Sequence, residues 1–236
     1  MRARPATEPH GPTPLAIFDL DGTLVDSGAN ILAGLRATFA ALGLPVPDDT
    51  ELVHYIGPPV RHSFRLRAGL DHADAEEAGR LYGRISDERF RDGVSVYPGV
   101  REALDALAEN GARLAIATSK PEPQALALLD EHGLSGGFEV VVGYRPTGER
   151  ESKAEIIREV LDLVAGPGGT AEAAVMVGDR EHDLTGASAN GIPSVWAGWG
   201  YGSPEEGAFA TLTAAQPEQL ADAVWSVIGP VHRPSR

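Results

Sequence analysis

The chain has 236 residues, of which 42% are hydrophobic and 23% are charged, so it is long enough to bury a sizeable core in one or two domains. Its 34 acidic residues outnumber its 20 Lys and Arg residues, and the formal net charge of −14 argues against a nucleic-acid polymer or an anionic membrane as a partner. The absence of cysteine excludes disulfide bonds and thiol chemistry and is consistent with a reducing compartment.

Residues 1–14 contain two arginines and several prolines but no apolar run of the kind that a signal peptide needs, so we expect a disordered N-terminal tail. We expect a second, shorter tail at residues 230–236. The sequence lacks the run of about eighteen apolar residues from which a membrane-spanning helix is recognised. These features favour a cytoplasmic protein, and we expect a monomer or a homodimer.

The first predicted strand, residues 15–18, leads directly into two acids, Asp19 and Asp21, and then Gly22. If the strand ends at Asp19, Asp21 lies in the turn, which Gly22 allows to fold back over Asp19. Two unit charges about 4 Å apart repel by about 4 kcal/mol at an effective dielectric near 20, so a cation or a shared proton is needed. Mg²⁺ prefers such oxygen ligands. The alternative is an ordinary Asp-Gly turn with solvated carboxylates.

Residues 26–96 are predicted to form a helical insertion without strands. Ser27 can cap its first helix, whose apolar positions recur at helical spacing up to Gly43. Asp48 is the expected cap of a short second helix. After the rigid turn Ile56-Gly57-Pro58-Pro59, residues 60–90 are expected to be helical.

Strands and helices alternate through the rest of the chain. Further strands are expected at residues 113–117, 138–142, 174–177 and 194–197. Several are continuous apolar runs, which is typical of a parallel sheet covered by helices on both faces. The fold class is therefore α/β, and the functional site is expected at the carboxyl ends of the strands.

Polar residues follow three of these strands. Thr118 and Ser119 can supply hydroxyl and backbone donors at a helix start, which suits a phosphate group; the alternative is simple helix capping. Asp179 and Asp183 follow the fourth strand, and the alternative for them is a solvated first helical turn.

Lys153 is the most informative single residue outside the opening stretch. Ser152 and Glu155 predict a capping box, which places Lys153 in the first helical turn, where the helix dipole disfavours a cation by about a few tenths of a kcal/mol. A lysine that reaches the strand ends can neutralise an anion shared with Asp19; the alternative is a solvent-exposed side chain. His54 and His182 have no partner at metal-ligand spacing and are interpreted as non-ligands.

Four motifs in this order resemble those of the haloacid dehalogenase superfamily, and in particular its Mg²⁺-dependent phosphatases with a helical cap: Asp19-Leu20-Asp21-Gly22-Thr23, Thr118, Lys153, and Gly178-Asp179 with Asp183. The resemblance covers residues 15 to about 228. It implies a Rossmann-like core formed by residues 15–25 and 97–229 and a cap formed by residues 26–96. Finer similarity, in residues 56–59, 150–156, 178–180 and 198–202, is to the 5′-nucleotidase-like or phosphoglycolate-phosphatase-like branch.

The resemblance also implies roles for these residues. Asp19 would be the nucleophile that becomes an aspartyl-phosphate, and Asp21 would protonate the leaving alcohol and then activate water. Mg²⁺ would be held by the Asp19 carboxylate, the Asp21 main-chain carbonyl and Asp179. Thr118 and Ser119 would bind the oxygens of the transferring phosphoryl group. Lys153 would offset the negative charge of that group. Asp183 would not bind the metal directly but would orient a metal-bound water or Lys153.

Departures from the family pattern distinguish between activities. A dehalogenase would not carry an acid at position 21, and a phosphonate hydrolase would use a cap lysine, whereas residues 26–96 contain no lysine. A phosphosugar mutase stays open as an alternative, although Thr23 is the phosphatase-like choice. A phospho-acceptor or ligand-binding module without turnover, as in receiver domains, is a further alternative.

The substrate is expected to be a small phosphorylated metabolite, and its identity depends on the cap. Arg61 or Arg65 can meet a carboxylate or a second anionic group of such a substrate. The alternative is that both arginines are surface residues that offset the acidity of the chain. The sequence does not rank a nucleotide against phosphoglycolate or a sugar phosphate.

Overall fold

The computed structural model describes residues 13–145, 150, 152–166 and 173–229. The two expected tails, residues 1–14 and 230–236, therefore lie outside the described residues except for positions 13 and 14, and their disorder stays a prediction. In the described part of the chain, no helix is both long and apolar enough to cross a membrane.

A six-stranded, fully parallel sheet forms the centre of the molecule. Its strands, in spatial order, are β5 (Val140–Tyr144), β4 (Arg113–Pro121), β1 (Leu15–Phe18), β6 (Ala174–Gly178), β7 (Ser194–Ala197) and β8 (Leu212–Ala214). The expected parallel sheet is confirmed. The edge strand β8 was not predicted, because three residues are too few to display a strand period.

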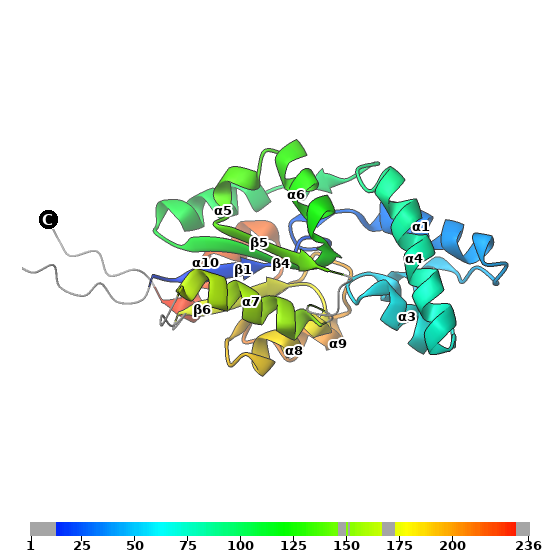
Figure 1. Ribbon diagram of the computed structural model, residues 1–236. Helices are drawn as coiled ribbons and strands as arrows, with labels where there is room; N and C mark the ends of the chain where they lie inside the picture. The colour runs from blue at the N-terminus through cyan, green and yellow to red at the C-terminus, as the bar shows by residue number, and fades with distance from the viewer. Residues whose placement is uncertain (1–12, 146–149, 151, 167–172, 230–236) are drawn as a thin grey trace, which may run out of the picture.

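Helices cover both faces of this sheet (Figure 1). One face packs against α5 (Val100–Glu109), α6 (Glu122–Glu131) and α10 (Leu220–Ile228), and the other against α7 (Lys153–Ala165) and α8 (Glu181–Ala189). Successive residues of β1 alternate between them, with Phe18 in the first hydrophobic cluster and Ile17 in the second. Burial on both faces explains why the strand is a continuous apolar run.

The cap lies beyond one end of the sheet (Figure 1) and has its own hydrophobic cluster. Its helices are α1 (Gly28–Ala41), α2 (Asp49–Leu52), the 3₁₀ helix η1 (Val53–Tyr55), α3 (Val60–Leu66) and α4 (His72–Arg89). Phe39 centres the cluster, with its ring centroid 5.8 Å from that of Tyr55 and 5.3 Å from that of Phe64. The helical stretch expected at residues 60–90 consists of two helices, α3 and α4.

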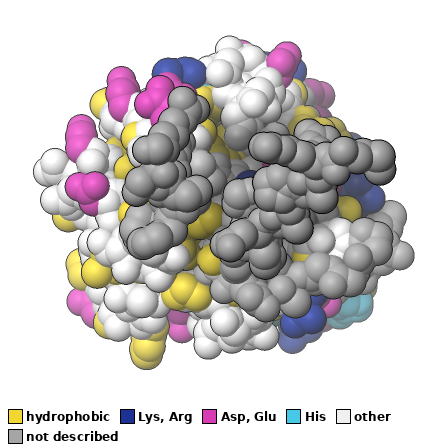
Figure 2. Space-filling view, turned by 90° about the vertical axis from the view of Figure 1, so that its left-hand side faces the viewer, with side chains coloured by type: hydrophobic (Ala, Val, Ile, Leu, Met, Phe, Trp, Pro, Cys, Tyr) yellow, Lys and Arg dark blue, Asp and Glu magenta, His cyan; other side chains and the backbone are white. Residues whose placement is uncertain are grey.

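Two short strands join the cap to the core. β2 (Val25–Asp26) pairs antiparallel with β3 (Ser95–Val96), so the expectation of no strand in residues 26–96 is wrong at both ends of that segment. Two-residue strands carry no readable period in the sequence. The remaining short elements are η2 (Ser135–Gly137), α9 (Pro204–Gly207) and η3 (Pro217–Gln219). On the face opposite the cap, acidic, basic and hydrophobic side chains of the described residues are interspersed (Figure 2).

Candidate active site

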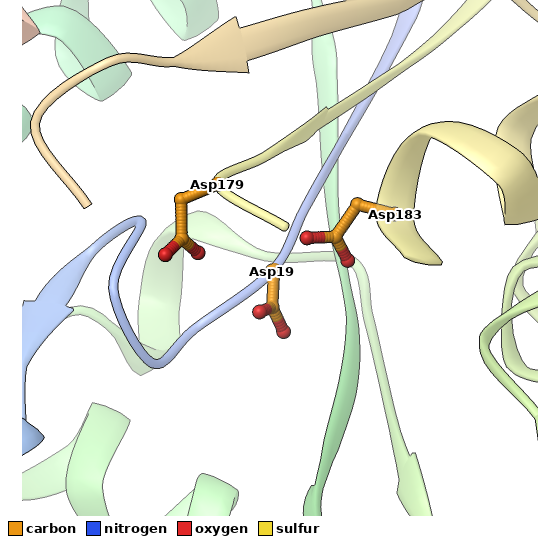
Figure 3. Close-up of side chains that lie close together, drawn as sticks. All are labelled: Asp19, Asp179 and Asp183. Carbon is orange, nitrogen blue, oxygen red and sulfur yellow. The ribbon is translucent and has the colours of Figure 1, made fainter. Parts of the chain in front are cut away.

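The carboxyl ends of two adjacent strands and the start of the following helix bring the predicted acids together. Asp19 follows β1, Asp179 follows β6, and Asp183 comes from the first turn of α8. Each offers a carboxylate oxygen, and these three oxygens all lie within 4.8 Å of one another. Figure 3 shows the three side chains directed into one space between the strand ends. We call these three residues the carboxylate cluster.

Glycines make room for this cluster. Gly22 has a φ of 85°, and a Cβ on it would lie 2.3 Å from Oδ2 of Asp179. A Cβ on Gly178 would lie 2.3 Å from Cγ of Asp183. Any side chain at either position would displace an acid of the cluster, so these glycines belong to the construction of the site.

Hydrogen bonds fix both oxygens of Asp179. Thr23 Oγ1 donates to Oδ1 over 3.1 Å, and the backbone N–H of Tyr201 donates to Oδ2 over 2.8 Å. Burial, followed by the charges of Asp183 and Asp19, nevertheless raises the pKa of Asp179 well above its usual value. The charged form of this acid is therefore under-compensated in the protein alone.

The side chain of Lys153 extends from the first residue of α7 to the carboxyl ends of the strands. Its Nζ lies 2.8 Å from Oδ1 of Asp19 and 2.8 Å from Oδ1 of Asp183, and it donates to the backbone oxygen of Ala117 over 2.9 Å. Burial opposes the ammonium charge, but the two carboxylates outweigh it and raise the pKa of Lys153. The predicted capping box of Ser152 and Glu155 is confirmed.

The charges of this region suit a divalent cation. Of the three buried carboxylates, Asp19 and Asp183 contact the ammonium of Lys153, and burial raises the pKa of Asp19 despite that contact. Closely spaced carboxylate oxygens are the donors that a hard cation such as Mg²⁺ prefers. The donor set therefore fits the metal that the sequence implies. His182 is not among these donors; burial lowers its pKa to about 3, so its imidazole is neutral.

The side chain of Asp21 turns away from the carboxylate cluster. Its two oxygens lie 3.0 and 3.1 Å from Nζ of Lys120, and Ser27 Oγ donates to Oδ1 over 2.6 Å. The Ser27 hydroxyl consequently does not cap α1, contrary to the sequence interpretation. The hydroxyl of Tyr201 accepts from the N–H groups of Ser27 and Gly28 instead.

Lys120 was missed by the sequence reasoning. It directly follows Thr118 and Ser119, but the strand was expected to end at residue 117, so the direction of the Lys120 side chain was not predictable. In the structure β4 continues to Pro121. The signal in the sequence was a lysine immediately after a candidate phosphate-binding motif.

Thr118 and Ser119 line the space next to Asp19, although not at a helix start as expected. Both lie within β4, and α6 begins only at Glu122, because the extended backbone runs on to the end of the strand. Among the described residues, the buried Oγ of Ser119 has no hydrogen-bond partner. A buried, unsatisfied hydroxyl beside Asp19 suits an incoming anion.

A cavity of about 600 Å³ separates these residues from the cap. Its floor includes Asp19, Asp21 and Lys120, and its cap wall includes Arg61. The Arg61 guanidinium carbon lies 5.1 Å from the ring centroid of Tyr144, and its Nη1 lies 3.8 Å from a Glu76 oxygen. Arg65, the alternative contact predicted for a substrate anion, is exposed and does not line the cavity.

Two core side chains, those of Arg180 and Gln124, form hydrogen bonds with the cap. Nη1 of Arg180 donates to the backbone oxygen of Ile56 and, over 3.4 Å, to that of Val53. Nε2 of Gln124 donates to Oδ1 of Asp87 over 2.7 Å. These contacts hold the cap over the carboxylate cluster.

A sequence model of the haloacid dehalogenase-like hydrolases matches residues 16–197. The chain belongs to this family. The match extends from β1 to the end of β7, so it includes every predicted site residue. The family membership expected from the four motifs is thereby confirmed.

Relatives of this hydrolase differ in their named activities. Tyrosine-protein kinase PtkA of Mycobacterium tuberculosis is 40% identical over 199 residues, which are 84% of this chain and 67% of PtkA. A 5′-nucleotidase of Pseudomonas aeruginosa is 39% identical over 86% of this chain and 89% of its own. A phosphoglycolate phosphatase of Agrobacterium fabrum is 35% identical over 80% and 82% of the two chains. With the family match, the last two confirm the expectation of a phosphatase.

Solved structures confirm the fold class. A protein from Clostridium acetobutylicum, described as a predicted phosphatase, superposes with a TM-score of 0.83 at 28% identity, over 92% of this chain and 100% of that one. PtkA of Mycobacterium tuberculosis superposes with a TM-score of 0.75 at 36% identity, over 93% and 99%. The Rossmann-like α/β core is thus shared with both proteins.

Proposed function

We propose that this hydrolase is a Mg²⁺-dependent phosphomonoesterase that forms an aspartyl-phosphate on Asp19. The observation that carries the proposal is the contrast between its two neighbouring acids. Asp19 lies in the carboxylate cluster and contacts Lys153, whereas Asp21 points into the cavity and contacts Lys120. One acid is thus placed to attack and the other to move a proton.

In the first half of the reaction, an oxygen of Asp19 attacks phosphorus, and the bond from phosphorus to the alcohol oxygen breaks. Lys153 lies against the attacking carboxylate and offsets the charge of two anions brought together. The hydroxyls of Thr118 and Ser119, which line the same cavity, would donate to the non-bridging oxygens. Asp21 gives its proton to the departing alcohol and, in the second half, takes one from the attacking water.

Mg²⁺ would be held by the carboxylates of Asp19 and Asp179 and by the main-chain carbonyl of Asp21. When bound, it would supply most of the positive charge that the transferring phosphoryl group requires. Asp183 belongs to the same cluster and contacts Lys153, so its proposed part is to orient that lysine or a bound water.

The substrate proposed for this site is a small phosphorylated metabolite, either a nucleotide or a phosphorylated acid such as phosphoglycolate. A cavity of about 600 Å³ is within the range that accommodates single small molecules. The relatives named 5′-nucleotidase and phosphoglycolate phosphatase support these two classes. Arg61 in the cap wall is the proposed contact for a second anionic group of the substrate.

The test is release of inorganic phosphate from p-nitrophenyl phosphate, with and without Mg²⁺, by wild-type protein and by Asp19→Asn. The wild type should require Mg²⁺, and the variant should lose at least about 10³-fold in kcat, as expected for a nucleophile. Substantial activity in Asp19→Asn would contradict the proposal. A panel of nucleoside monophosphates, phosphoglycolate and sugar phosphates would then identify the substrate class, and conversion of a sugar phosphate into an isomer without phosphate release would indicate a mutase.

The similarity to PtkA makes phosphoryl transfer to tyrosine a second candidate. An aspartyl-phosphate can pass its phosphoryl group to a hydroxyl as well as to water. Incubation with ATP labelled in its γ-phosphate and a tyrosine-containing polypeptide distinguishes the two. Label that appears in the polypeptide faster than in inorganic phosphate would favour the kinase, and the reverse would favour the phosphatase.

A further inference from the structure

Each of the two acids that react in the proposed mechanism contacts its own lysine. Lys153 contacts Asp19, whereas Nζ of Lys120 lies 3.0 and 3.1 Å from the two oxygens of Asp21. The side chains of Lys120 and Asp21 are only 6% and 12% exposed, so water screens this pair weakly. Two charge-assisted contacts therefore hold the Asp21 carboxylate.

An irregularity of β4 directs Lys120 into the cavity. The register of β4 against β5 shifts between Thr118 and Pro121. Within this shift, the backbone N–H of Lys120 donates to Oγ1 of Thr118 over 3.2 Å. Such bulges re-aim side chains next to functional sites. The local fold thus places Lys120 opposite Asp21, between the predicted phosphate-binding residues and the cap.

A proton-transferring acid at position 21 needs such a restraint. Asp21 is only two residues from Asp19, and a cation in the carboxylate cluster would attract its side chain as a further ligand. General acid catalysis instead requires that Asp21 stay within hydrogen-bond reach of the leaving oxygen. Ser27 Oγ donates only to Oδ1, whereas Lys120 contacts both oxygens. Lys120 therefore fixes the direction in which the carboxylate points, and Ser27 adds a hydrogen bond to one of its oxygens.

We propose that Lys120 is a positioning residue, which holds the Asp21 side chain toward the leaving oxygen and away from the carboxylate cluster; this role rests on the proposed function. When the bond between phosphorus and the alcohol oxygen breaks, the proton of Asp21 goes to that oxygen. When water attacks the phosphorylated Asp19, the bond between phosphorus and Asp19 breaks and the proton of water goes to Asp21. Lys120 keeps its own protons in both halves.

The experiment compares Lys120→Met with the wild type on two esters. p-Nitrophenolate departs without a proton, whereas the alkoxide of glycerol 2-phosphate needs one. Because both esters share the second half of the reaction, the comparison uses the single-turnover rate of alcohol release. If Lys120 acts through Asp21, this rate should fall about 100-fold for glycerol 2-phosphate and by no more than about threefold for p-nitrophenyl phosphate, with both KM values nearly unchanged. A merely structural lysine would not separate the two esters.

Three further variants keep the test decisive. Lys120→Arg keeps the charge and should recover most of the loss on glycerol 2-phosphate. Lys120→Leu, which also removes the donor to Asp21, replaces Lys120→Met if the latter does not fold. The double variant Asp21→Asn/Lys120→Met should hydrolyse glycerol 2-phosphate no more slowly than Asp21→Asn alone, because a residue that acts only through Asp21 has nothing left to position.

Several results would overturn this role. Equal losses on the two esters would make Lys120 a general structural or phosphate-binding residue. A rise in KM without a fall in the rate of alcohol release would make it a substrate contact, and an additional loss in the double variant would show that it acts independently of Asp21. If the wild type releases phosphate from neither ester, the proposed function and the role of Lys120 fall together.

Discussion

The core and the cap face each other across one cavity, but their charged side chains are held differently. In the core, Asp19, Lys153 and Asp179 are 2%, 4% and 0% exposed, and their partners are buried too. In the cap wall, the side chains of Arg61 and Arg84 are 19% and 61% exposed. Buried charges are fixed by geometry, whereas exposed ones keep rotamer freedom.

This difference suggests a separation of tasks. The core groups are fixed by strand ends and close-packed glycines, so a change there alters the reaction itself. The cap has its own aromatic cluster around Phe39, so its wall can change without disturbing the core. We therefore expect a core substitution to change the KM values of all substrates to a similar extent. A cap substitution should change the KM of some substrates much more than that of others.

Apart from the replacement of Asp19, the largest effect is expected at Asp21. Replacement by Asn removes the transferable proton, and kcat for alkyl phosphates should fall about 10²–10⁴-fold, the usual contribution of general acid–base catalysis. Mg²⁺ affinity, measured by isothermal titration calorimetry, should stay near that of the wild type, because the side chain lies outside the carboxylate cluster. A large loss of metal affinity would show that the Asp21 side chain binds the metal as Asp19 does, and would contradict the different roles proposed for the two acids.

An intermediate effect is expected at Arg61 and none at Arg65. Both belong to α3, one turn apart, but only Arg61 lines the cavity. Arg61→Ala should raise KM for phosphoglycolate about tenfold, in line with the loss of one charged hydrogen bond, and leave KM for p-nitrophenyl phosphate nearly unchanged. Arg65→Ala is the matched control on the same helix. Equal changes of KM in the two variants, or for the two substrates, would show that this cap contact does not select the substrate.

The smallest effect is a gain in stability from Asp179→Asn in the metal-free protein. The folded-state pKa of Asp179 is raised well above 3.8 by burial and by its acidic neighbours. The stability from its protonation is complete below pH 3.8 and is lost as the pH rises through the raised pKa. Asn carries no charge, so unfolding at neutral pH should cost about 0.5–2 kcal/mol more than in the wild type.

Chemical denaturation in the presence of a chelator measures this gain, and adding Mg²⁺ provides the contrast. The wild type should be stabilised by Mg²⁺ much more than Asp179→Asn, because the cation compensates the carboxylate that the variant lacks. A metal-free variant less stable than the wild type at neutral pH would show that the hydrogen bonds to Asp179 outweigh its uncompensated charge.

The sequence predicted the core well because its main strands are continuous apolar runs and three of them lead directly into polar residues. Asp19 and Asp179 could be placed at one sheet edge from strand order alone, since parallel strands end at the same side. Lys153 could be predicted because its capping box fixes where the helix begins. The three-residue strand β8 and the pair β2 and β3 are too short to give a periodic pattern.

The features that sequence could not supply depend on side-chain direction and on contacts distant along the chain. Lys120 reaches Asp21 across 99 positions, through a register shift that no pattern signals. Ser27 occupies the predicted cap position, but its hydroxyl contacts Asp21. The hydroxyl of Tyr201 instead accepts the hydrogen bond from the first backbone N–H group of α1. The choice between Arg61 and Arg65 required the packing of α3 against the cavity.

The central claim is that Asp19 alone carries the phosphoryl group during turnover. Rapid acid quenching of the enzyme with Mg²⁺ and substrate, followed by peptide mapping with mass spectrometry, tests it most directly. We predict a phosphorylated peptide with the modification on Asp19, absent from Asp19→Asn. Turnover with no covalent phosphate, or with the phosphate on another residue, would contradict this account.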